Sequence, residues 1–133
     1  MDFVLDASIA ACWALRDEDH PKATVALKEL QHSSCFVPDI WWFEIRNILL
    51  TGERRGRIAP EESAASLRRI SKLRILQESD RNGTEILRLA RKHRLTFYDA
   101  SYLELAFNMN LPIATLDSDL LRAAKAESVT LLE

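Results

Sequence analysis

The sequence predicts a single α/β domain over residues 1–133, with a central parallel β-sheet of about four or five strands flanked by α-helices. A length of 133 residues suits one domain. Short apolar runs alternate with longer amphipathic segments, and strands that alternate with helices form parallel sheets covered on both faces. No repeat, low-complexity tract or linker interrupts the alternation, and the chain has only three glycines and four prolines. We therefore expect one shared hydrophobic core.

The first half of the chain contains two short apolar runs that are typical of buried strands. The segments around them have helical spacing of apolar residues or residues that favour a helix start. The pattern predicts, in order, a strand at Phe3–Asp6, a helix from Ser8 to about Leu15, a helix opened by His20-Pro21 and ending at Leu30, a strand at Cys35–Val37, and a helix capped by Pro38-Asp39 that runs to about Glu53.

The second half continues the alternation. Pro60 followed by two glutamates is a favoured helix start, because proline suits the first turn and acidic side chains interact well with the helix dipole. The pattern predicts, in order, a helix from Pro60, a strand at Leu73–Gln77, a helix from Asp80 to about Lys92, a helix capped by Asp99 that runs to about Phe107, a strand at Ile113–Thr115, a helix from Ser118 to about Ala126, and a last strand at Val129–Leu131.

Composition is typical of a soluble globular protein, with 47% hydrophobic and 29% charged residues. No stretch approaches the roughly 18 apolar residues of a membrane span, and the N-terminus lacks the basic and apolar regions of a secretory signal. The two cysteines, Cys12 and Cys35, have no CxxC or zinc-binding spacing. We therefore expect a cytoplasmic protein with reduced core cysteines and no membrane partner.

Charge is distributed unevenly along the chain. The segment from Arg46 to Arg94 holds 13 Lys/Arg and 6 Asp/Glu, a local charge of +7, whereas the two flanks together hold 5 and 14, a local charge of −9. A basic segment of this kind can attract phosphate groups. Helices that use arginine only for solvation give the same pattern, so charge alone leaves both interpretations open.

Acidic residues recur where strands end and helices begin. Asp6 ends the first strand, Asp117 ends the strand in LPIATLDSD, and Asp99 opens the helix of FYDASYLELA. Ligands of open α/β sheets bind outside the carboxyl ends of the strands, so Asp6 and Asp117 meet there if their strands are neighbours. Glu44 lies in the otherwise apolar helix IWWFEIRNILL, and Asn47 follows on the same face.

Each acid alone has a structural explanation, since Asp99 and Asp117 suit helix N-caps and Glu44 suits a solvated stripe. Four converging carboxylates, however, would repel one another and take up protons. A divalent cation resolves this repulsion, because Mg²⁺ and Mn²⁺ prefer oxygen ligands. The hydroxyls of Ser8 and Thr115, each two residues from an acid, are expected to orient a metal-bound water.

Four blocks of the sequence, VLDASIA, FEIRNILL, YDASYLELA and IATLDSDL, resemble the acidic blocks of PIN-domain ribonucleases and, more narrowly, of VapC-like toxins of toxin–antitoxin pairs. The resemblance extends from Asp2 to about Leu132. It implies a parallel sheet with helices on both sides, an Mg²⁺- or Mn²⁺-dependent endoribonuclease, a homodimer and a cognate antitoxin. The catalytic and metal-binding acids of this family correspond to Asp6, Glu44, Asp99 and Asp117.

Other positions match less central features of the same family. Asp119 matches an additional metal-site acid of some members, Ser8 the small hydroxyl after the first acid, and Asn47 a polar residue near the second. Ser8, Asn47 and Thr115 are expected to surround the metal ligands. No core acid is missing, so the resemblance implies metal-assisted hydrolysis of a phosphodiester bond.

The basic segment supplies the residues that we expect to guide RNA phosphates. They are Arg46, Arg54, Arg55 and Arg57. The adjacent Trp41 and Trp42 could stack bases, but neighbouring tryptophans on a helix more often serve a core or an interface.

Other protein classes fit the residues less well. A haloacid-dehalogenase-type phosphatase would need an aspartate where Ser8 stands, and a response-regulator receiver would need a phosphoacceptor aspartate and a later lysine that are not evident. A non-catalytic PIN-like RNA- or protein-binding module and a housekeeping PIN nuclease remain the alternatives to a toxin.

Overall fold

A computed structural model describes residues 1–15 and 17–133 and, within them, four strands and seven helices. The elements are β1 (Phe3–Leu5), α1 (Ala7–Ala14), α2 (Pro21–Glu29), β2 (Cys35–Pro38), α3 (Trp41–Arg54), α4 (Pro60–Ser71), β3 (Ile75–Glu78), α5 (Gly83–His93), α6 (Phe97–Met109), β4 (Ile113–Ala114) and α7 (Ser118–Ala126). The strands form one parallel sheet in the order β3-β2-β1-β4. This confirms the predicted fold class.

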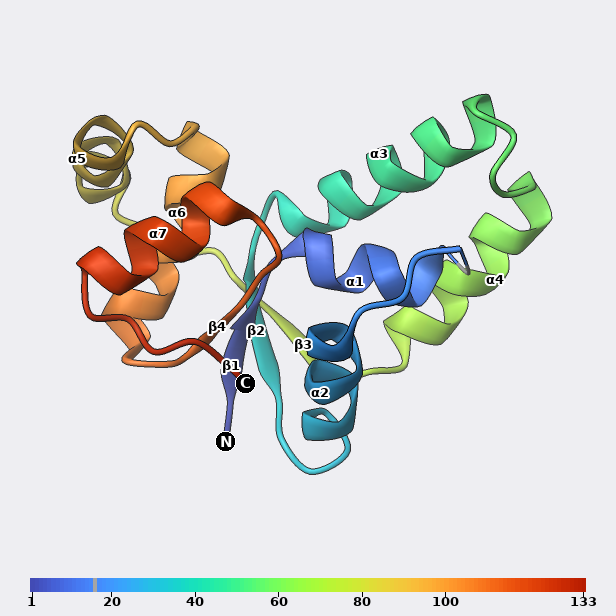
Figure 1. Cartoon of the computed structure of the whole chain (residues 1–133), viewed down its shortest axis with the longest axis horizontal. Helices are drawn as coiled ribbons and strands as arrows, with labels where there is room; N and C mark the ends of the chain where they lie inside the picture. The colour runs from blue at the N-terminus through green and yellow to red at the C-terminus, as the bar shows by residue number, and fades with distance from the viewer. Residues whose placement is uncertain (16) are drawn as a thin grey trace.

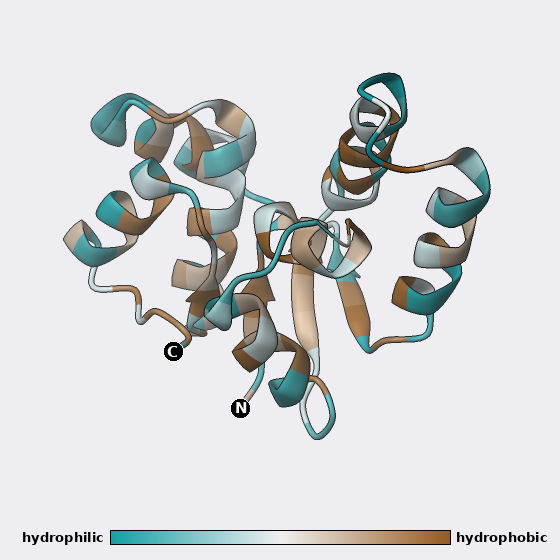
Figure 2. Cartoon of the chain, turned by 45° about the vertical axis from the view of Figure 1, so that its right-hand side comes forward, coloured by the Kyte–Doolittle hydropathy of each residue, from teal (hydrophilic) through white to brown (hydrophobic). Residues whose placement is uncertain are grey.

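The helices form two layers, one on each face of the sheet (Figure 1). Helix α1 packs against α2, α3 and α4 on one face, and α6 packs against α5 and α7 on the other. The central strand β1 is buried along its whole length, which explains why FVL is a continuous apolar run rather than an alternating one. The edge strand β3 is partly exposed. Figure 2 shows the hydrophobic strands between the helices and the hydrophilic turn that joins α3 to α4.

All three tryptophans of the chain lie in the α1–α4 layer. Trp41, the first residue of α3, is fully buried and meets Trp42 edge-on, with ring centroids 4.7 Å apart. Trp13 in α1 donates from Nε1 to the carbonyl of Ala23 in α2, over 2.9 Å. Trp41 is therefore a core residue, which agrees with the interpretation that the tryptophan pair belongs to a core or an interface.

Both cysteines are free. Cys35 is buried in β2, and burial raises the pKa of its thiol to about 12. Cys12 is only partly buried, so the expectation of a core cysteine holds for Cys35 and less fully for Cys12. None of the described helices is long and apolar enough to cross a membrane.

Several helix starts differ from the prediction. Asp39 does not cap α3; the chain makes a turn first, Ile40 is the N-cap, and no side chain caps the helix. Helix α5 begins at Gly83 rather than Asp80, because Asn82 accepts the backbone N–H of Glu85 over 3.1 Å. A turn thus precedes α3 in place of a side-chain cap, and a local cap at Asn82 sets the start of α5.

The last predicted strand is reduced to a single parallel bridge between Ile113 and Leu131. Strand β4 is only two residues long, so a neighbouring segment can form little more than one bridge with its free edge. Backbone hydrogen bonds from Ile113 to Thr130 and from Leu132 to Ile113 hold the C-terminal segment in place.

A buried ion pair fixes the start of α5 against α6. Arg81, 11% exposed, contacts Glu104, 2% exposed, over 3.4 Å, and its guanidinium also donates to the carbonyl of Ser101. The backbone N–H of Asn82 donates to the other oxygen of Glu104. These contacts hold residues 80–82 outside the helix, which explains why α5 starts later than predicted.

We predict that Glu104→Gln lowers the free energy of unfolding by about 3 kcal/mol, because it leaves the buried Arg81 charge without its counterion. Glu85→Gln is a matched control, since it breaks the i,i+3 pair with the exposed Arg88 and should lower the free energy of unfolding much less than Glu104→Gln does. Urea unfolding of the two variants checks this. Equal decreases in the free energy of unfolding would show that the buried Arg81–Glu104 pair stabilises the fold no more than an exposed pair does.

Candidate active site

Four acidic residues lie at the N-terminal ends of four different helices. Asp6 is the N-cap of α1, Glu44 lies in the first turn of α3, Asp99 in that of α6, and Asp117 is the N-cap of α7. The N-terminal end of a helix carries partial positive charge, which favours carboxylates there. Strands β1 and β4 are neighbours, with Leu5 paired to Ala114, so Asp6 and Asp117 leave the sheet side by side, as expected. We call this group of four acids the acidic rim.

Asp6 is the buried member of the acidic rim, with 6% of its surface exposed. Its Oδ2 accepts hydrogen bonds from the hydroxyls of Ser8, over 2.7 Å, and Thr115, over 2.6 Å. Burial raises the pKa of Asp6, and the nearby Asp117 charge raises it further, whereas the two hydroxyl bonds lower it. The two hydroxyls thus replace part of the water that this carboxylate gives up.

The same two hydroxyls join the β1–α1 and β4–α7 connections. Ser8 Oγ accepts the N–H of Leu116 over 3.0 Å, and Thr115 Oγ1 accepts the N–H of Asp117 over 3.0 Å. Both hydroxyl hydrogens are donated to Asp6, so in this structure Ser8 and Thr115 position the carboxylate. Their expected role in orienting a water stays a prediction.

Glu44 has a partner that the sequence analysis missed. The hydroxyl of Tyr102, a fully buried residue of α6, donates to Glu44 Oε1. Burial raises the pKa of Glu44 to about 6, with smaller contributions from the Asp6 and Asp99 charges, while the Tyr102 bond lowers it. The missed signal was spacing: Tyr102 follows Asp99 by three residues, which places both on one face of a helix. Glu44 is therefore half-buried and bonded across the rim, not part of a solvated stripe.

Asp99 is not the N-cap of its helix, contrary to the prediction. Thr96 takes that position and accepts the N–H of Asp99 over 3.1 Å. The Asp99 side chain is therefore free of capping. Burial makes the largest contribution to the raised pKa of Asp99, and the charges of Asp117, Asp6 and Asp119 raise this pKa further.

Asp117 does cap its helix, and its Oδ1 accepts the N–H of Leu120 over 3.0 Å. Asp119, the additional acid of the predicted metal set, is largely exposed and pairs with Arg122 over 2.9 Å. Asn47 lies one turn beyond Glu44 on α3 and is exposed. Asp119 thus lies next to the acidic rim, and Arg122 partly neutralises its charge.

The electrostatics show which acids the fold brings together. Asp6, Glu44 and Asp99 each have a pKa raised partly by other acids of the rim. Within the described part of the chain, however, no three His, Cys, Asp or Glu side chains stand close enough to form a ready-made metal cluster. An all-oxygen donor set whose members raise one another's pKa fits a hard divalent cation, which would relieve the repulsion and draw the carboxylates closer.

Comparison with known proteins shows the family of this chain. The profile of the PIN domain matches residues 3–126. The chain belongs to the PIN-domain family. The matched span includes all four acids of the rim and every strand of the sheet.

Two relatives from Pyrobaculum aerophilum are similar to this PIN domain. The curated protein named Exonuclease VapC9 is 33% identical over 84 residues, an alignment that spans 62% of this chain and 62% of that protein's length. The crystal structure of PAE2754 has a TM-score of 0.74 at 25% identity, covering 92% of this chain and 84% of the other. The likeness in structure therefore extends over nearly the whole PIN domain.

The four arginines expected to guide RNA are not equivalent in this PIN domain. Arg57 pairs with Asp17 and Glu18, each over 2.8 Å. Arg46 lies over the Trp42 ring at 5.7 Å and donates to the Trp42 carbonyl. Arg54 and Arg55 are exposed at the far end of α3. Arg54 follows Glu44 by ten residues, which is about 15 Å along a helix.

We predict that Glu44→Gln stabilises the metal-free protein at neutral pH but not at acidic pH. The pKa of Glu44 rises from an ordinary 4.5 to about 6 on folding. Above about pH 4.5 the unfolded chain loses a proton that the folded protein keeps, so the contribution of Glu44 to stability falls as pH rises through about 6. The glutamine can still accept the Tyr102 bond, and its advantage at pH 7 should be on the order of 1 kcal/mol.

Urea unfolding in the presence of EDTA between pH 4 and pH 7 measures this difference. An advantage of the variant that is the same at both ends of the range would show that the Glu44 carboxyl does not carry a raised pKa.

Proposed function

We propose that this PIN domain is a nuclease, and specifically an Mg²⁺- or Mn²⁺-dependent endoribonuclease that acts in the cytoplasm as the toxin of a toxin–antitoxin pair. Membership of the PIN-domain family and similarity to a protein named Exonuclease VapC9 support nuclease activity. The observation that supports the metal dependence is the acidic rim: four carboxyl groups enter it from four helix starts, and the pKa of three of them is raised by burial and by the charge of at least one other acid of the rim.

Asp6, Glu44, Asp99 and Asp117 are the residues that would hold the cation, with Asp119 beside them. A divalent cation bound there supplies a water of lowered pKa and neutralises the charge that develops on the phosphate oxygens. The protein's own residues fix the geometry. Ser8 and Thr115 hold Asp6 from two different connections, and Tyr102 holds Glu44 from the opposite helical layer.

Endonucleolytic and exonucleolytic cleavage are the two candidate modes. The resemblance to VapC-like toxins favours an endonuclease, whereas the name of the relative Exonuclease VapC9 favours an exonuclease. A circular single-stranded RNA separates them, because it offers no end. Linearisation of the circle by this PIN domain in Mn²⁺ supports the endonuclease, and degradation of the linear RNA alone supports the exonuclease.

The partners are part of the same proposal. The resemblance supports a cognate antitoxin and a homodimer, which co-purification from the native operon and sedimentation velocity would test. A housekeeping nuclease would cleave RNA without arresting growth when it is expressed alone. A non-catalytic binding module would need no divalent cation at the acidic rim.

We predict that Asp6→Asn abolishes RNA cleavage without unfolding the protein. The asparagine oxygen can still accept the Ser8 and Thr115 hydrogen bonds, and removal of a buried like charge should leave the melting temperature unchanged or raised in EDTA. Asp80→Asn, at an exposed acid before α5, is the matched control and should cleave normally. Wild-type cleavage rates in Asp6→Asn would show that the acidic rim is not the catalytic site.

We also predict that Mn²⁺ raises the melting temperature, because the cation binds the folded acidic rim and not the unfolded chain. Asp99→Asn should reduce this rise, since it removes one oxygen ligand, while Asp80→Asn should retain it. Differential scanning calorimetry across a Mn²⁺ series measures both. A melting temperature that does not respond to millimolar Mn²⁺ would count against a metal site and in favour of the binding module.

A further inference from the structure

A second charged feature of the surface lies beside the acidic rim. A cavity of about 480 Å³ opens between the end of α5 and the start of α7. It is lined by Lys92, His93, Arg94, Asp119 and Arg122. We call this the α5–α7 pocket. Four of its five lining residues carry basic groups, and none of the four is among the arginines that the sequence analysis assigned to RNA.

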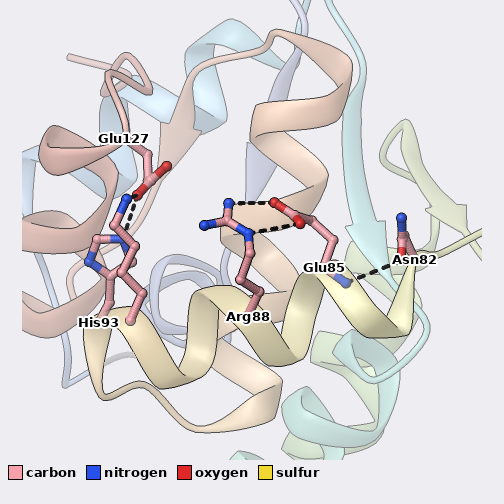
Figure 3. A network of polar contacts seen from close by, with 6 residues as sticks. Asn82, Glu85, Arg88, His93 and Glu127 are labelled. Atoms are coloured by element: carbon pink, nitrogen blue, oxygen red, sulfur yellow. Dashed lines mark hydrogen bonds and ion pairs between the residues drawn. The ribbon is translucent and has the colours of Figure 1, made fainter.

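Two acidic residues hold the basic groups in place. Glu127, whose side chain is 9% exposed, contacts Lys92 Nζ and His93 Nε2, each over 2.6 Å (Figure 3). Arg122 contacts Asp119 over 2.9 Å and donates to the His93 carbonyl over 2.9 Å. The hydrogen bonds to Lys92 and His93 keep the pKa of Glu127 below its ordinary value. Three of the four basic side chains of the pocket, Lys92, His93 and Arg122, are therefore held by contacts within the protein.

Cations outnumber anions in and around this pocket. Lys92, Arg94 and Arg122 are positive, while Asp119 and Glu127 are negative, which leaves one excess positive charge among these five side chains. Arg94 forms no ion pair within residues 1–15 and 17–133. One excess positive charge matches one phosphodiester, which carries a single negative charge.

Arg94 has an unusual backbone for its residue type. It ends α5 in the left-handed region, with φ 55° and ψ 43°. Glycine and asparagine are the residues that normally take this position, because a Cβ is unfavourable there. An arginine here adds a long cationic side chain to the pocket lining at a position where glycine or asparagine would fit the backbone better.

The pocket also adjoins the catalytic residues proposed above. Asp119 lines the pocket and is one of the charges that raise the pKa of Asp99. A group bound in the pocket therefore lies next to the acidic rim. Arg54 and Arg55, in contrast, stand at the far end of α3, in the other helical layer.

We infer that the α5–α7 pocket binds a non-scissile phosphodiester of the RNA strand, next to the phosphate that is cleaved, with Arg94 as its principal cation. The inference rests on the proposed nuclease function and adds a path for the strand, from the end of α3 across the acidic rim to the α5–α7 pocket.

The test measures binding of a short labelled single-stranded RNA to the Asp6→Asn protein across a salt series. Arg94→Asn keeps a residue that tolerates the left-handed backbone and removes the charge, so it should leave the melting temperature unchanged or raised. It should also lower the slope of log affinity against log salt by about 0.7, the value for one phosphate contact on a single strand. Arg94→Lys should restore the slope, and Arg91→Gln, at an exposed arginine of α5 outside the pocket, should not change it.

In the active protein, Arg94→Asn should raise KM for RNA and leave kcat unchanged. Equal slopes of log affinity against log salt for Arg94→Asn and for the protein that keeps Arg94 would overturn the inference. A decrease in slope for Arg91→Gln as large as that for Arg94→Asn would also overturn it. If Arg94→Asn weakens binding to an acidic partner protein and leaves the RNA slope alone, the pocket serves that partner and the inference is wrong. Failure of the proposed function is a separate result: the wild-type protein would then not cleave RNA in Mn²⁺ at all.

Discussion

The burial of one carboxylate at the end of the central strand constrains the rest of the site. Asp6 follows a strand that is inaccessible to solvent, so its charge must be solvated by the protein itself. Ser8 supplies one hydrogen bond from the α1 side and Thr115 supplies another from the β4 side. Because the second donor comes from 109 residues away, Asp6 is satisfied only when β1 and β4 are paired in register. The pairing of β1 with β4 therefore both solvates Asp6 and brings the β4–α7 connection, which carries Asp117, to the acidic rim.

The two helical layers contribute equally to the acidic rim. Asp6 and Glu44 belong to helices of one layer, and Asp99 and Asp117 belong to helices of the other. The bond from Tyr102 to Glu44 crosses between the layers at this point. The acids thus meet where the sheet ends and the layers face each other directly, and a cation bound there would join the layers as well as its ligands.

Much of the fold was predictable because it depends on patterns that are local in the sequence. The run FVL has no alternation, so it predicted a doubly covered strand, and the acids at strand ends predicted a site on the rim. The sequence did not determine which of two nearby residues caps a helix, because Thr96 and Asp99 are both good N-caps and only the tertiary structure selects one. It also could not predict pairings over long separations. Tyr102 with Glu44 and Arg57 with Asp17 are 58 and 40 residues apart.

The placement of the tryptophans decides what optical methods can observe in this protein. Trp13, Trp41 and Trp42 all belong to α1 and α3, so tryptophan fluorescence reports on a single layer. Helices α5, α6 and α7 have no indole, so tryptophan emission carries no direct signal from these three helices. An unfolding curve followed by tryptophan emission alone would therefore report directly on α1 and α3. Far-ultraviolet circular dichroism includes all seven described helices, and a mismatch between the two signals would reveal whether the layers unfold together.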